Sequence, residues 1–213
     1  MAVRKVVTRR GRGFRGYFPS KKLNRMVEYE SLLERDAIYL FEFSPGVISY
    51  QEQPALIHYE QGGNLRKYFP DFEVTLRTGE IIHIEIKPSQ KLMSKELDQK
   101  LTAISQFYWE QGRLFRLLTD ADIRQEPRLS NLKVLQEVHR SELDLTMSSE
   151  YLKHIFTFHE KVLLADLYSQ IGRARVLKHI AKGELRCDFF QSFNSSTNFA
   201  WLSLESDYDA VQF

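Results

Sequence analysis

The sequence predicts an α/β domain followed by a smaller, mainly helical domain. Helix-like and strand-like segments alternate up to about residue 120, the texture of the chain changes near Thr119-Asp120, and the remainder reads largely as helix. At 213 residues the chain is long enough for one large domain or two small ones. We therefore expect a flexible arm over 1–25, an α/β domain over 26–120 and a second domain over 121–213.

The elements of the α/β domain follow from the spacing of apolar residues and from turn residues. Apolar side chains at helical spacing predict a first helix, which the Ser-Pro-Gly at 44–46 ends. Alternation between apolar and polar residues predicts the strands, and Gly112 ends a second, longer helix. The expected order is helix 27–43, strand 47–60 interrupted by Pro54, strand 65–77, strand 81–87, helix 92–112 and strand 113–120.

The second domain has the pattern of a winged helix. Helices are expected at 126–141 and 148–160, and a helix–turn–helix with its turn at Gly172 is expected at 161–185. "RCDFF" and "TNFAWLSLE" would form the closing β-hairpin. The second helix of the pair carries basic residues, which either contact DNA or form the wet face of a packing helix, so DNA and protein contact both stay open. These residues are Arg173, Arg175, Lys178 and Lys182.

Composition indicates a soluble intracellular protein. Hydrophobic residues make up 43% of the chain and charged residues 27%. Cys187 is the single cysteine, so no intrachain disulfide can form, and a reducing cytoplasm is expected. No apolar run approaches the ~20 residues that cross a bilayer, and the N-terminal basic residues precede no apolar core of a signal peptide. We expect a cytoplasmic protein without membrane contact.

Positive charge is concentrated at the N-terminus. Residues 1–25 contain nine Arg and Lys residues and no Asp or Glu, although the net charge of the whole chain is only +2. Glycines and aromatic residues among the arginines predict a flexible segment that contacts DNA phosphates, the alternative being a tail that only aids solubility. The expected DNA-binding residues are Arg9, Arg10, Arg12, Arg15, Lys21 and Lys22.

The segment "YFPDFEVTLRTGEIIHIEIKP" (68–88) predicts a hairpin with chemistry on one edge. Because alternate side chains of a strand share a face, the isoleucines 82, 84 and 86 should point into the core under the long helix. His83, Glu85 and Lys87 should then share the opposite face. Glu85 and Lys87 could form an ordinary exposed ion pair. A histidine hydrogen-bonded beside the strand is favoured over one that reaches a cleft.

An upstream carboxylate makes a metal-dependent site a second interpretation of Glu85 and Lys87. Asp71 lies sixteen positions before Lys87, across the hairpin turn, and an acidic helix carrying Glu30 and Glu34 precedes both. Carboxylates are the oxygen ligands that Mg²⁺ and Mn²⁺ prefer, and a lysine beside the metal can orient or deprotonate water and neutralise phosphate charge. The pattern predicts in-line hydrolysis of a phosphodiester, with a salt-bridged structural hairpin as the alternative.

Other cofactors are not expected. The six histidines are scattered without the spacing of metal ligands, and Cys187 has no partner cysteine, so a zinc site is not predicted. "GRGFRG" precedes no strand–helix unit, so the sequence does not predict an ATP-binding loop either.

The arrangement resembles the PD-(D/E)xK, restriction-endonuclease-like superfamily. More narrowly, "FPSKKLNRMVEYESLLERDAIYLFEFSPGVISYQEQPALI", "KYFPDFEVTLRTGEIIHIEIKPSQKL" and "YWEQGRLFRLLTDADI" resemble TnsA, the endonuclease subunit of heteromeric Tn-seven-type transposases, over about residues 15–123. The resemblance assigns catalysis to Glu34, Asp71, Glu85 and Lys87, and metal binding to the three carboxylates. The residues alone do not choose between Glu30 and Glu34.

The resemblance also implies a function and partners. It implies a Mg²⁺-dependent endonuclease, with Mn²⁺ able to substitute, that cuts the 5′ strands at transposon ends while the DDE transposase TnsB cuts the 3′ strands. It further implies that the winged-helix-like domain contacts the ATP-dependent regulator TnsC. Two alternatives stay open: a stand-alone restriction or repair nuclease of the same fold, and a non-enzymatic adaptor bound to DNA.

Overall fold

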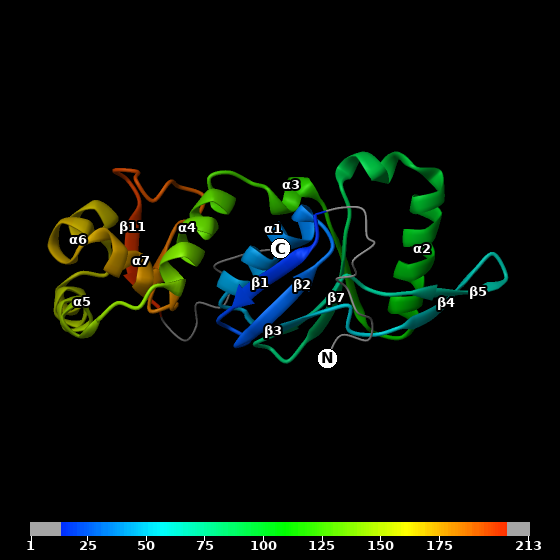
Figure 1. The fold of residues 1–213 in the computed structure, drawn as a ribbon, viewed down its shortest axis with the longest axis horizontal. Helices are drawn as coiled ribbons and strands as arrows, with labels where there is room; N and C mark the ends of the chain where they lie inside the picture. The colour runs from blue at the N-terminus through cyan, green and yellow to red at the C-terminus, as the bar shows by residue number, and fades with distance from the viewer. Residues whose placement is uncertain (1–13, 204–213) are drawn as a thin grey trace. The chain divides into compact units, whose positions relative to one another are not determined.

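The computed structural model describes residues 14–203, which form two compact units (Figure 1). The first comprises residues 14–42 and 46–124, and the second residues 43–45 and 125–203. Three of the predicted DNA-binding residues, Arg9, Arg10 and Arg12, lie outside the described residues.

A four-stranded sheet forms the centre of the first unit. Its strand order is β3 (Val47–Glu52), β6 (Phe72–Leu76), β7 (Ile81–Ile86) and β8 (Leu114–Leu118). The first three are antiparallel neighbours, whereas β7 and β8 are parallel. Parallel neighbours need a long crossover, which the 3₁₀ turn η1 (Ser89–Met93) and helix α2 (Lys95–Glu110) supply. The mixed α/β architecture agrees with the sequence prediction.

The two faces of the sheet are covered by different helices. Phe72 pairs with Ile84 across β6 and β7, and its ring lies 5.4 Å from that of Phe41 in α1 (Leu32–Phe43). His83, on the opposite face, contacts Tyr108 of α2. The expectation that the isoleucines of β7 lie under the long helix is therefore wrong. That helix covers the polar face, and the isoleucine face lies against α1.

A hairpin leads the chain to Asp71. Strands β4 (Ile57–Gln61) and β5 (Asn64–Tyr68) pair with each other and lie beside α2 in Figure 1. Apolar side chains from the hairpin and the helix form one buried cluster, which consists of Ile57, Tyr59, Tyr68, Ile104 and Tyr108. The predicted single strand 65–77 is wrong, because the chain breaks at Pro70-Asp71, and β5 and β6 belong to different sheets.

The predicted arm and first helix both need correction. Strands β1 (Gly16–Ser20) and β2 (Arg25–Tyr29) form an antiparallel hairpin, so the basic stretch is folded from residue 16 and the helix does not start at 27. Gly16 here serves close packing: a Cβ at this position would lie 2.5 Å from the Tyr29 hydroxyl oxygen. Phe18 faces Val27 in the pairing, and both are buried, which favours strand over helix.

Capping residues set the boundaries of the later helices in the first unit. The predicted helix 92–112 is divided at Ser94, whose side chain accepts the backbone N–H of Leu97 and so caps α2. A short helix, α3 (Asp120–Ile123), ends the first unit with a capping box between Thr119 and Asp122. No helix in residues 14–203 is long and apolar enough to cross a membrane.

The second unit is mainly helical, as predicted. Its elements are α4 (Arg128–Arg140), α5 (Thr146–Phe158), β9 (Val162–Leu163), α6 (Leu164–Ile171), α7 (Arg173–Ala181), β10 (Leu185–Cys187) and β11 (Phe199–Leu202). Gly172, at a φ of 85°, separates α6 from α7. The three strands form an antiparallel sheet in the order β10-β11-β9. A buried hydrogen-bonded chain from Ser148 through His179 to Glu184 ties α5 to the end of α7.

Candidate active site

Asp71 is fixed where the central sheet begins. It precedes β6, and its Oδ2 accepts the backbone N–H of Ile86 on β7 at 2.7 Å. Its own carbonyl oxygen accepts the N–H of Gln53, which follows β3, at 3.0 Å. Three neighbouring strands thus set the position of one carboxylate, and this requires the break at Pro70 that releases Asp71 from β5.

Glu85 and Lys87 meet Asp71 at the end of β7. The Lys87 Nζ lies 2.6 Å from Glu85 Oε1 and 3.3 Å from Asp71 Oδ2. The other oxygen of Glu85, Oε2, accepts the Tyr68 hydroxyl at 2.7 Å. The Lys87 backbone N–H donates to the Leu118 carbonyl, so β8 holds the lysine in place. The structure therefore brings together Asp71, Glu85 and Lys87, as the strand pattern predicted.

Glu85 is buried, whereas Asp71 and Lys87 are partly exposed to solvent. The Glu85 side chain is 3% exposed, whereas those of Asp71 and Lys87 are 19% and 22% exposed. Both hydrogen bonds to Asp71 fall on Oδ2, so Oδ1 has no donor among the described residues. The site thus presents one carboxylate oxygen and one ammonium toward solvent.

Burial and neighbouring charges shift the titration of the cluster. Burial, together with the negative charge of Glu85, raises the pKa of Asp71 to about 8. Burial alone would lower the pKa of Lys87, but the carboxylates of Asp71 and Glu85 outweigh it and raise that pKa. Lys87 therefore stays protonated at neutral pH, where Asp71 also keeps its proton.

Glu34 lies at the start of α1, and its carboxylate is hydrogen-bonded to the residues just before the helix. Its carboxylate accepts the backbone N–H of Glu30 at 2.7 Å and the hydroxyl of Ser31 at 2.9 Å, while Ser31 Oγ accepts the N–H of Glu34. This is a helix-capping arrangement. Burial raises the pKa of Glu34, with the negative charge of Glu30 adding to it and the charge of Lys87 opposing it, so the residue also senses the cluster.

The acids do not form a closed ligand cage. Among residues 14–203, no three or more His, Cys, Asp or Glu side chains are grouped as a metal site. Asp71 and Glu85 are joined through Lys87, and the Glu34 carboxylate is held by its own helix start. The choice between Glu34 and Glu30 stays a prediction. Glu30 pairs with Arg15 at 3.1 Å and accepts the side-chain amide of Gln53 at 3.4 Å.

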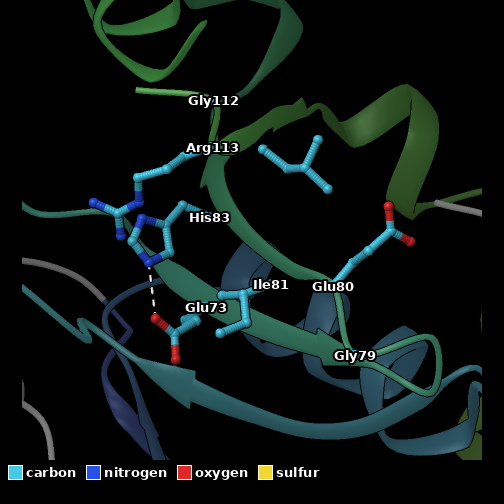
Figure 2. Close-up of a pocket in the computed structure, with 8 residues that line it drawn as sticks. Glu73, Gly79, Glu80, Ile81, His83, Gly112 and Arg113 are labelled. Atoms are coloured by element: carbon cyan, nitrogen blue, oxygen red, sulfur yellow. Dashed lines mark hydrogen bonds and ion pairs between the residues drawn. The ribbon is translucent and has the colours of Figure 1, made fainter. Parts of the chain in front are cut away.

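His83 has a structural environment, as expected. Its Nδ1 lies 2.6 Å from the Tyr108 hydroxyl and its Nε2 lies 2.8 Å from Glu73 Oε2. A carboxylate can only accept, so Nε2 carries the proton and Nδ1 accepts from Tyr108. Burial lowers the pKa of His83, which favours this neutral ring. Figure 2 shows His83 paired with Glu73 in a pocket that also contains Arg113.

Several predicted DNA-binding cations lie elsewhere than expected. The Lys22 ammonium donates to the carbonyl oxygens of Phe41 and Val47, both at 2.7 Å, which favours a structural role for Lys22 over the predicted DNA contact. Arg15 pairs with Glu30. Lys21 is exposed.

Two basic residues of α7 are also engaged. The Lys178 ammonium donates to the carbonyls of Val138, His139 and Ser141 at the end of α4. Lys182, just after α7, pairs with Glu184 at 2.8 Å. The charge of this helix is thus partly used inside the second unit.

Sequence reasoning missed Tyr68 and Gln53. Tyr68 is hydrogen-bonded to Glu85, and the parity of β5 could have placed it toward α2, had the strand been ended at Tyr68. The position of Gln53 depends on a backbone conformation that no sequence pattern displays.

One protein family matches the chain. Residues 44–120 match the family described as "TnsA-like endonuclease N terminal". The matched range contains Asp71, Glu85 and Lys87 but not Glu34. No curated protein matches the chain significantly.

Proposed function

Because residues 44–120 match the family of TnsA-like endonuclease N-terminal domains, we propose that this protein is a Mg²⁺-dependent endonuclease that cuts the 5′ strands at transposon ends. It would act with the DDE transposase TnsB, which cuts the 3′ strands. The observation that carries the proposal is the meeting of Asp71, Glu85 and Lys87, which three hydrogen bonds or ion pairs fix at the ends of adjacent strands.

The donor set fits a hard divalent cation. Asp71 offers Oδ1, which accepts no hydrogen bond from the described residues, and Glu85 is a second carboxylate beside it. Burial, followed by the negative charge of Glu85, raises the pKa of Asp71, and a bound cation would relieve both. Oxygen ligands of this kind suit Mg²⁺, and Mn²⁺ would substitute. Asp71 and Glu85 would hold the ion, with Glu34 as the predicted third ligand. When bound, the ion supplies a lowered pKa for water and charge neutralisation at the phosphate.

The protein's own groups divide the remaining work. Hydrolysis joins a water oxygen to phosphorus and breaks the bond to the leaving oxygen, which takes up a proton. Lys87, held protonated by two carboxylates, would orient the water and neutralise the phosphate charge; a lysine in this state cannot act as the base. Tyr68 keeps Glu85 in place by donating to its buried oxygen. The β3 and β7 backbones hold Asp71.

The second unit supports a partner role. The element order β9, α6, α7, β10 and β11 and the sheet order β10-β11-β9 support the proposal that this unit is winged-helix-like. Because Lys178 caps α4 and Lys182 pairs with Glu184, the helix offers less charge to DNA than its sequence suggests. We therefore favour contact with the ATP-dependent regulator TnsC over DNA contact here. DNA phosphates would be contacted by Arg9, Arg10, Arg12, Arg15 and Lys21.

The decisive test replaces one oxygen. Asp71→Asn keeps an acceptor for the Ile86 N–H but removes the charge that would bind metal. Cleavage of a labelled transposon end with Mg²⁺, TnsB and TnsC should fall by roughly a thousandfold or more, with the thermal midpoint no lower than that of wild type. Activity within a few-fold of wild type would rule out this site.

The same assay separates the alternatives. Cutting by the purified protein without TnsB would identify a stand-alone nuclease. Failure to bind Mg²⁺ or Mn²⁺ in calorimetry, together with no cutting under any condition, would identify a DNA-bound adaptor.

A further inference from the structure

Gln53 adopts a backbone conformation that its sequence position disfavours. Its φ is +38°, in the left-handed region, and among the described non-glycine residues only Asn24 shares a positive φ. Asn24 lies in the β1–β2 turn, where asparagine tolerates this conformation. Gln53 precedes Pro54, and a residue before proline is biased toward extended backbone. The conformation is therefore strained, and surrounding contacts must hold it.

The contacts of Gln53 reach both halves of the candidate active site. Its backbone N–H donates to the Asp71 carbonyl at 3.0 Å, one step beyond the β3–β6 pairing of Glu52 with Phe72. Its side-chain Nε2 donates to Glu30 Oε2 at 3.4 Å. Glu30 in turn donates its backbone N–H to Glu34. One residue thus links the Asp71 segment to the start of α1.

The side-chain oxygen of Gln53 adds a second cost. Gln53 is only 7% exposed, and its Oε1 is buried without a hydrogen-bond partner among the described residues. Turning the amide over would place Oε1 against the Glu30 carboxylate, so the orientation is defined. A buried acceptor without a donor destabilises a fold. Strain and an unsatisfied acceptor therefore coincide at one residue beside Asp71.

We propose that Gln53 is a positioning residue of the nuclease site, an inference that rests on the proposed function. Its side-chain amide aligns the Glu30–Glu34 segment with Asp71. Glycine would relieve the strained φ but remove the amide. A residue that served only to end β3 would be replaced by glycine without loss.

The test compares two matched glycine substitutions. Gln53→Gly and Asn24→Gly each relieve a positive φ, but only the first residue touches the site. Gln53→Gly should lower kcat about 10- to 100-fold with KM changed less than threefold. Its thermal midpoint should equal or exceed that of wild type. Asn24→Gly should leave kcat unchanged. Gln53→Asn, which keeps a shorter amide and tolerates the backbone, should give an intermediate kcat.

A second readout does not depend on cleavage. Hydrogen exchange of the peptide containing Glu30 should accelerate about tenfold in Gln53→Gly and stay unchanged in Asn24→Gly, because the Glu30 amide loses its alignment with Glu34. Unchanged kcat in Gln53→Gly, with Asp71→Asn inactive, would overturn this inference alone. A wild-type protein that does not cut DNA, or an Asp71→Asn variant that cuts normally, would overturn the proposed function and this inference with it.

Discussion

Each end of α1 carries a glutamate near a lysine, but the two glutamates are bound in different ways: Glu42 is buried, whereas Glu34 is half-buried. At the end of the helix, Glu42 accepts four hydrogen bonds: the Ser20 hydroxyl at 2.7 Å, the Tyr50 hydroxyl at 2.6 Å, and the N–H groups of Lys21 and Lys22 at 2.8 and 3.0 Å. These bonds fasten the β1–β2 hairpin to α1 and β3. At this end both the Glu42 carboxylate and the Lys22 ammonium are hydrogen-bonded within the fold.

The start of α1 is arranged differently. Glu34 is satisfied only by its own helix start, and the lysine nearby, Lys87, is shared by Asp71 and Glu85. Three acids therefore face one cation. Ionisation of all three would leave excess negative charge, so Asp71 keeps its proton below about pH 8 unless a positive ligand replaces it.

The two lysines report the difference. Burial lowers the pKa of Lys22 to about 7, and the opposing attraction of Glu42 is too weak to reverse this. The pKa of Lys87 is raised in spite of burial, because two carboxylates act on it. Both lysines are largely removed from solvent, so burial does not distinguish the two clusters. They differ in the number of carboxylates that act on each lysine: one for Lys22 and two for Lys87.

Replacing each lysine in turn should give the largest difference in cleavage between the two ends of α1. Lys87→Met should reduce cleavage of a transposon end by roughly a thousandfold, since the water and phosphate lose their protonated partner. Lys22→Met should leave cleavage within threefold of wild type. It should cost about 1–2 kcal/mol in urea unfolding, because the carbonyls of Phe41 and Val47 lose their donor. Equal losses of cleavage in the two variants would show that the two ends of α1 are not functionally distinct.

The two glutamates at the start of α1 give a smaller, sharper test. If Glu34 completes the metal site, Glu34→Gln should lower single-turnover cleavage at least about a hundredfold, while Glu30→Gln stays within a few-fold. The reverse pattern would assign the metal to Glu30, which lies just before α1.

A capping control distinguishes catalysis from helix stability at Glu34. Asp122 caps α3 in a similar way, accepting the N–H and hydroxyl of Thr119. Asp122→Asn should cost about 1 kcal/mol in urea unfolding with cleavage unchanged. If Glu34→Gln shows only this behaviour, Glu34 is a cap and not a metal ligand.

The sequence predicted the central residues because local rules fix them. Alternation along β7 placed Glu85 and Lys87 on one face, and the hairpin turn brought Asp71 across to them. The order of strands and helices in the first unit also follows from periodicity and turns. These features depend on neighbours within a few residues, which a single sequence displays.

The sequence predictions fail where the structure depends on contacts between residues far apart in the chain. Parity says that Glu85 and Ile84 point opposite ways, but not which helix covers which face. Glu85 can be buried because Tyr68, from another sheet, donates to it. The basic stretch before residue 25 pairs with β2, but the apolar spacing of β2 continues into α1 and predicts a helix. Without a predicted partner strand, the basic stretch is expected to be an arm. The roles of Lys22 and Gln53 depend on backbone carbonyls, which no composition reveals.

The last prediction concerns the pH dependence of stability, which should have opposite signs at the two clusters. The pKa of Asp71 is raised in the folded protein from 3.8 to about 8, so the folded state holds a proton that the unfolded state releases. Its contribution to stability is complete below about pH 4 and is lost as the pH rises toward 8. The pKa of Lys22 is lowered from 10.5 to about 7, so its contribution grows as the pH rises from 7 toward 10.5. Each full proton difference gives a slope of about 1.4 kcal/mol per pH unit.

Urea unfolding without divalent ions, from pH 5 to pH 10, would measure both slopes, and differences between variants remove the contribution of other titrating groups. Relative to wild type, Asp71→Asn should remove a decline in the free energy of unfolding between pH 5 and pH 8. Lys22→Met should remove a rise above pH 7. Mg²⁺ should make the wild-type decline shallower, because a cation at Asp71 replaces the proton that the folded state otherwise holds, and it should have no such effect on Asp71→Asn. An Asp71→Asn profile parallel to wild type below pH 8 would mean that the active-site end of α1 carries no excess charge, and the contrast between the two ends would then rest on geometry alone.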